Sequence, residues 1–293
     1  MSATFGSTIP LLFVMIAISG SAQTKADLTA RYGYPDVQRF VVRPGITLTA
    51  GYAENRTACQ MLIEPEKSLG HANNEEQSMA TETVTAIIDE LIPKPERGIL
   101  LEHAIENMGA AELRHFVYQN LTISRQFVRY LPKNRDETTA TIIRKDGICG
   151  SPTTSHEYAS GIELTAIDLQ SRYGDPIAER YIVRPGVTAM VTYGSDDAAC
   201  HIVIESQRPL VLGEQPRKNM ASDVVDDIIE ATAPSEVKGA KRDSLLMITG
   251  CAQSEMDFFE NLTISRVTDQ CLPLKPEREQ SVRITFNRQA CHK

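Results

Sequence analysis

Apolar and polar positions alternate along two neighbouring stretches of the chain. In residues 46–52 every second side chain is apolar, and residues 59–64 repeat the alternation after a polar turn. A period of two with one apolar face predicts half-buried β-strands. A further strand is expected at 38–43, because Pro44 and Gly45 form a turn directly after it.

Residues 81–91 follow a helical period instead. Their apolar side chains recur three and four positions apart, which predicts one stripe that packs on the sheet. The stripe consists of Val84, Ile87, Ile88 and Leu91. A shorter helix is expected to end at Gly33, because glycine suits a helix C-terminus and Pro35 follows it.

The chain repeats itself at an offset of 141 residues. Residues 39–45 (RFVVRPG) return as 180–186 (RYIVRPG), and 120–125 (NLTISR) return unchanged as 261–266. Such a match predicts a tandem duplication of a module of ordinary domain size. The repeated segment 121–125, followed by residues 139–143, predicts two closing strands in each module.

The predicted fold class is α+β. Each of two homologous modules is expected to be a meandering antiparallel sheet with a helix packed on one face. The expected organisation is a signal peptide at residues 1–22, module 1 at 23–150, a linker at 151–161 and module 2 at 162–293.

Residues 98–116 give conflicting expectations. Residues 100–114 predict a helix, whereas the corresponding residues 244–249 predict a strand. On such a helix His103 and Glu106 share a face and suit a metal ion, together with Glu102 and His115. A solvated helix face explains the same four residues, and we expect neither a metal nor a cofactor.

Residues 9–18 form an apolar run of ten, which is too short to span a bilayer. Small residues follow at 20–22, so the segment predicts a cleaved signal peptide and an exported protein, extracellular or periplasmic. A buried N-terminal segment is the alternative interpretation. No membrane span is expected once the leader is removed.

Six cysteines remain in the mature chain, and an even number in an exported protein predicts disulfides. The repeat pairs cysteines at corresponding positions, and it leaves two that occur only in module 2. The predicted bonds are Cys59–Cys149, Cys200–Cys291 and Cys251–Cys271. Possible glycosylation sites are Asn55, Asn120 and Asn261, which matter only in a host that glycosylates.

The formal net charge of -8, with no basic tract, argues against nucleic acid and against an anionic membrane as partner. No nucleophile elbow, P-loop, zinc-protease motif or dinucleotide fingerprint occurs, so no catalytic residue is assigned. Several charged residues recur in both modules and are expected to form a structural ion-pair network. They are Asp27/Asp168, Arg31/Arg172, Arg39/Arg180, Arg43/Arg184, Glu64/Glu205 and Arg125/Arg266.

The order of helix, Gly-x-Pro, strand meander and Val-x-Tyr resembles the small exported modules of β-lactamase-inhibitor-like and outer-membrane-assembly lipoprotein families. The resemblance covers residues 27–64 and their copy. It implies protein binding and supplies no functional residue. The chain departs from it in its longer modules and in the absence of Trp and of a lipid-anchor cysteine.

The sequence therefore predicts an exported, disulfide-stabilised interaction protein whose partner is another protein or an envelope or matrix polymer. An alternative is an exported hydrolase with a site between the modules, built from residues such as Glu102, His103 and His201. A second alternative is a structural envelope or matrix component.

Overall fold

The computed structural model describes residues 23–66, 78–128, 137–145, 164–208, 210, 219–269, 278–288 and 291. The predicted signal peptide and linker lie outside these residues. We refer to the described residues 23–145 as the N-terminal half and to 164–291 as the C-terminal half.

The segments that repeat in sequence form matching elements in the two halves. The N-terminal half contains α1 (Lys25–Tyr32), β1 (Val37–Arg43), β2 (Ile46–Tyr52), β3 (Ala58–Pro65), α2 (Thr81–Leu91), α3 (Lys94–Arg97), β4 (Leu100–Met108), β5 (Ala111–Tyr118), β6 (Leu121–Val128) and β7 (Glu137–Arg144). The C-terminal half contains α4 (Ala166–Tyr173), β8 (Ala178–Arg184), β9 (Val187–Tyr193), β10 (Ala199–Ser206), β11 (Met220–Ala221), α5 (Ser222–Thr232), α6 (Ser235–Lys238), β12 (Lys241–Thr249), β13 (Ala252–Phe259), β14 (Leu262–Asp269) and β15 (Arg278–Phe286).

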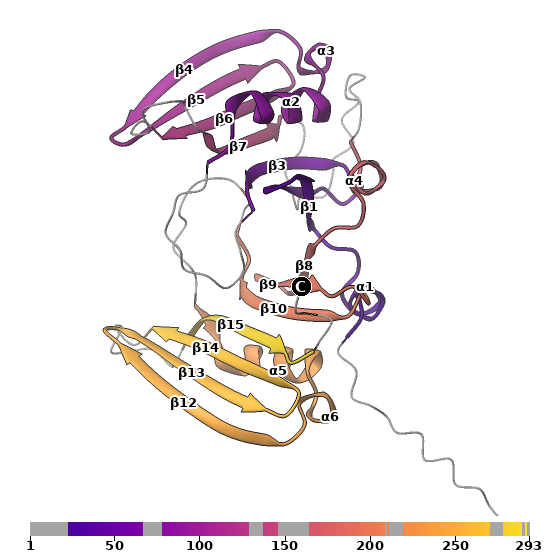
Figure 1. Ribbon diagram of the computed structural model, residues 1–293, viewed down its shortest axis with the longest axis vertical. Helices are drawn as coiled ribbons and strands as arrows, with labels where there is room; N and C mark the ends of the chain where they lie inside the picture. Colours follow the sequence, from indigo (N-terminus) through magenta and orange to yellow (C-terminus); the bar gives the residue numbers. More distant parts are fainter. Residues whose placement is uncertain are drawn as a thin grey trace, which may run out of the picture.

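The strands form one sheet that runs through the whole molecule (Figure 1). Its order is β12-β13-β14-β15-β10-β9-β8-β1-β2-β3-β7-β6-β5-β4, with β11 paired to β15. Neighbouring strands are antiparallel, as expected, but β3 pairs with β7 and β10 with β15, so each half joins two meanders instead of forming one. The halves join where β1 pairs with β8, and β4 and β12 end the sheet at opposite ends of the molecule (Figure 1).

Each half surrounds its own apolar core. The predicted stripe of α2 is buried against the strands of the N-terminal half, and α5 packs in the same way in the C-terminal half. An open sheet of this width curls when it covers such helices, which fits the bent ends in Figure 1. Among the described residues no helix has the length and apolarity to cross a membrane.

The short helices α1 and α4 are exchanged between the halves. Leu28 of α1 is buried in the core of the C-terminal half, and Leu169 of α4 is buried in the core of the N-terminal half. Backbone bonds hold the exchange: the Lys25 amide donates to the Asp197 carbonyl at 3.0 Å. From the sequence pattern α1 is expected to pack on the N-terminal half, to which it belongs. In the structure its apolar face is buried by the C-terminal half.

The helix expected at residues 100–114 is wrong. This segment forms the β4–β5 hairpin, and Gly109 makes its turn with a φ of 61°. Pairing of β5 with β6 extends the sheet through these residues and overrides their local helical spacing. The strand expected at 244–249 is present within β12.

Candidate interaction surface

The charged residues that recur in both halves fix local structure. Asp27 and Asp168 belong to capping boxes with Thr24 and Thr165 at the starts of α1 and α4. Hydrogen bonds from these threonines hold the pKa of each aspartate below its usual range. The aspartates therefore satisfy helix N-termini and are not available as a catalytic pair.

Arg31 and Arg172 hold the exchanged helices in place. The Arg172 Nη1 donates to the Glu90 carbonyl at 2.7 Å, and Arg31 makes the matching bond to the Ala231 carbonyl. Both carbonyls lie in the last turn of a core helix, where a cation is favoured. Tyr173 adds a 2.8 Å bond to the Glu90 carboxylate, and burial together with Glu90 raises the pKa of Tyr173 to about 12.

An ion pair crosses β2 from one flanking strand to the other. Arg39 on β1 donates to the Thr47 hydroxyl and, at 3.0 Å, to the Glu64 carboxylate on β3. The pair covers Thr47, so β2 is buried on both faces instead of the one that its alternation predicts. At the position in the C-terminal half that corresponds to Arg39, Arg180 pairs with Asp36 across the β1–β8 contact at 2.7 Å. The expected structural ion pair is thus present between Arg39 and Glu64, whereas Arg180 does not pair with Glu205, which pairs with Arg208 instead.

A buried polar cluster lies where β1 meets β8. Gln38 Nε2 donates to Oε1 of the fully buried Glu179 at 2.7 Å, and Lys25 Nζ lies 3.1 Å from the same oxygen. Tyr181 and Tyr193 donate to Oε2 at 2.7 and 3.1 Å. Burial raises the pKa of both tyrosines, which keeps them protonated as donors. Both carboxylate oxygens accept hydrogen bonds, so the cluster links β1 to β8, whereas Gln38 Oε1 is buried with no hydrogen-bond partner among the described residues.

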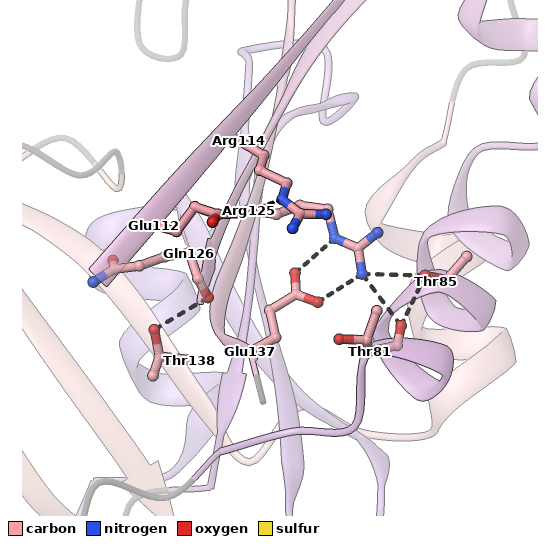
Figure 2. Close-up of polar contacts among 8 residues, drawn as sticks. All are labelled: Thr81, Thr85, Glu112, Arg114, Arg125, Gln126, Glu137 and Thr138. Carbon is pink, nitrogen blue, oxygen red and sulfur yellow. Dashed lines mark hydrogen bonds and ion pairs between the residues drawn. The ribbon is translucent and has the colours of Figure 1, made fainter. Parts of the chain in front are cut away.

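Figure 2 shows a second buried ion pair, between Arg125 on β6 and Glu137 on β7. The two bonds are 2.8 and 2.6 Å long, and the same guanidinium donates to the Thr81 carbonyl and the Thr85 hydroxyl of α2. Burial raises the pKa of Glu137, and Arg125 opposes that rise. The cluster fastens the first turn of α2 to the sheet (Figure 2). Arg114, beside it, pairs with Glu112 at 2.6 Å.

A pocket of about 100 Å³ lies between α2 and strands β5 and β6. Arg97 and Arg125 line it, but Arg97 is paired with Asp89 and Arg125 with Glu137. The volume is below the roughly 300 Å³ of ordinary small-molecule sites. We therefore assign no ligand to this pocket.

The residues considered for a metal or hydrolase site do not converge. His103 stacks on Phe116 with ring centroids 4.5 Å apart, and His115 bonds to Ser124 at 2.9 Å while its Nε2 lies 3.9 Å from Glu106. No group of three or more His, Cys, Asp or Glu side chains suited to a metal occurs within the described ranges.

His201 also lies far from the other residues of that site. It is on β10 and contacts Thr285 at 3.3 Å. Eight strands separate β10 from β4, which carries Glu102 and His103. These residues do not form a common site between the halves, which meet through the β1–β8 ladder.

The described cysteines are all disulfide-bonded. Cys200 pairs with Cys291, as the repeat predicts. Cys59 and Cys251 are bonded too, and their expected partners, Cys149 and Cys271, lie outside the described residues.

The sequon asparagines have structural roles as well. Asn120 and Asn261 donate through Nδ2 to the Glu96 and Val237 carbonyls of α3 and α6, at 2.8 and 3.0 Å. Asn55 accepts from the Thr57 amide through its side-chain oxygen at 3.0 Å. These bonds give the repeated Asn-Leu-Thr segment a role in positioning the short helices.

The two end strands form the exposed apolar feature that the sequence patterns missed. Within the described residues β4 pairs only with β5, and β12 only with β13. The side chains of all nine β12 residues are exposed, and β4 is nearly as open. The exposed apolar side chains of these two strands are Leu100, Leu101, Ile105, Met108, Leu245, Leu246, Met247 and Ile248. We call these two strands the end edges.

The end edges have the properties of strand-addition sites. Residues 245–248 are four consecutive apolar side chains, each between 41% and 63% exposed. A strand at the edge of a sheet, with one unpaired side and exposed apolar side chains, is a template for pairing with another strand. The sequence does contain a signal for this edge, which is the unbroken apolar run inside the strand expected at 244–249. A strand with one face in solvent alternates apolar and polar residues, and this segment does not.

Comparisons with known proteins add no functional assignment. No protein family matches the chain, and no curated protein does. A solved structure described as a bifunctional GH43-CE protein of Bacteroides eggerthii aligns at 10% identity, over 89% of this chain and 29% of that one. The chain thus spans less than a third of that protein. The TM-score is 0.14, so the likeness carries no argument about fold or function.

Proposed function

We propose that this protein is an exported, non-catalytic interaction protein built from two duplicated modules. It binds other chains by strand addition at its end edges. The observation that carries the proposal is the set of exposed apolar side chains on β4 and β12, whose outer edges pair with no strand within the described residues. Main-chain bonds supply affinity in such pairing, and alternate side chains supply specificity.

Export and duplication rest on separate support. Disulfides persist in oxidising compartments, and each described cysteine is bonded. The matching order of elements in the two halves, and residues such as Asn120 and Asn261 with the same bonding role, support descent from one repeated module. The buried and paired charges described above support a binding role over catalysis.

The test is affinity capture with the oxidised chain from Gln23 to Lys293 as bait. The bait is exposed to the native extracellular and envelope fraction beside the double variant Ile105→Lys/Leu246→Glu, which puts a charge on each end edge. Glu54→Lys, in the exposed β2–β3 turn, is the matched control. We expect wild type and control to retain the same protein and the double variant to lose it. Equal capture by the double variant contradicts the proposal.

A further inference from the structure

The two end edges carry opposite charges. β4 contains Glu102 and Glu106 and no Lys or Arg, whereas β12 begins with Lys241 and Arg242 and contains a single acid, Asp243. Charges of opposite sign across a strand pair stabilise it, and like charges destabilise it. Each edge therefore suits the other better than it suits a copy of itself.

Strand direction permits the same pairing. Every neighbouring pair along the path from β12 to β4 is antiparallel. β12 is the first strand of this path and β4 is the fourteenth, so the two run in opposite directions. A second copy that continues this order presents its β12 antiparallel to β4. Both strands have nine residues, so each matches the length of the other.

We propose that β4 of one copy pairs with β12 of the next, and that the protein assembles head to tail with itself. This inference rests on the proposed function and names its partner as a second copy of the chain. Because β4 and β12 are different surfaces, the contact is heterologous and leaves one edge unsatisfied at each end. Unless the assembly closes into a ring, it grows as an open chain.

One antiparallel register pairs a carboxylate with a cation and two apolar residues with two others, while it leaves Ile105 opposite Arg242 and Glu102 opposite Leu245. Placing Glu106 opposite Lys241 brings Leu101 opposite Leu246. The same register sets Leu100 opposite Met247. Lys241 already lies 2.7 Å from Asp257 within its own half, so the new contact extends an existing ion pair.

The first experiment is sedimentation velocity of the purified, oxidised chain over a wide concentration series. We expect a continuous series of oligomers that grows with concentration and shrinks as salt screens the charge pairs. Glu106→Lys is expected to raise the dissociation constant at least roughly tenfold. Combining it with Lys241→Glu is expected to recover association, while Glu54→Lys leaves it unchanged.

Mixing separates a head-to-tail contact from a symmetric one. Ile105→Lys blocks β4 and Leu246→Glu blocks β12, and both positions are exposed, so the fold is preserved. Each variant is expected to be monomeric alone, and the mixture to form a dimer that grows no further. Dimers of either variant alone overturn the proposal, because they require β4–β4 or β12–β12 pairing.

A wild-type chain that stays monomeric throughout also overturns it. If the edge variants still lose captured protein in that case, the proposed function stands and the partner is a different chain. If capture is unaffected by the edge variants, the proposed function fails as well.

Discussion

Gln38 and Glu179 lie directly opposite each other on β1 and β8, and the Gln38 amide donates to the Glu179 carboxylate at 2.7 Å. The two positions correspond in the sequence repeat, so at this point equivalent positions of the two halves face each other. If both positions carried a carboxylate, the two buried charges would repel each other. One amide and one carboxylate form a hydrogen bond instead, and Lys25 supplies the countercharge.

Gln38→Glu is therefore expected to destabilise the protein by about 3–5 kcal/mol at neutral pH, the range for an uncompensated buried charge. Urea unfolding measures this loss. Glu179→Gln is the matched substitution at the facing position, and it is expected to cost less because it buries no new charge. If both variants lose the same free energy of unfolding, the second buried carboxylate is not the cause and the prediction is wrong.

The capping boxes of α1 and α4 are expected to make stability depend on pH in acid. Asp27 and Asp168 have lowered pKa values in the folded state, so their contribution is present above the unfolded pKa and is lost as pH falls through the folded pKa. Thr24→Ala and Thr165→Ala are each expected to cost about 1 kcal/mol at neutral pH. Melting temperatures of the variants and of wild type, measured from neutral pH into acid, should converge once the aspartates are protonated.

Arg125→Ala removes the partner of a buried carboxylate. We expect a loss of about 3–5 kcal/mol at neutral pH. The pKa of Glu137, already raised by burial, rises further without the guanidinium, so protonation in acid relieves the penalty and the variant approaches wild type as pH falls. Arg242→Ala, at an exposed ion pair with Glu260, is the control and should change stability little. A pH-independent loss in Arg125→Ala would contradict this account.

Gly98 has a positive φ of 74°, and a Cβ there lies 2.8 Å from the Cβ of Gln119. Gly98→Ala is expected to combine backbone strain of roughly 1–2 kcal/mol with this steric clash. Gly33→Ala is the matched control, because its φ is 80° and a Cβ meets nothing within 4 Å. Chemical denaturation should show the larger loss for Gly98→Ala.

Local patterns predicted the elements whose neighbours are close in sequence. The stripe of α2 and the alternation of β3 are present, because each records which face of one element is buried. The destination of α1 was not predictable, since an amphipathic helix does not identify the core that buries it. The β4–β5 hairpin was missed because its β4 residues are exposed and carry no burial pattern.

In the candidate site too, features set by the sequence repeat were predictable, and features set by the sheet topology were not. Corresponding cysteines predicted the bond between Cys200 and Cys291 because the repeat equates positions without a structure. Ion pairs such as Arg39–Glu64 were expected from their recurrence. The end edges were not expected, because being the last strand of a sheet is a property of topology.

The exchange of α1 and α4 sets an order of events during biosynthesis. Lys25 bonds to Asp197 and Leu28 is buried by strands of the C-terminal half, so the first helix waits until most of the chain has been made. Such distant contacts slow folding. Until then Leu28 has no core to pack in, and the N-terminal half lacks Leu169, which completes its own core.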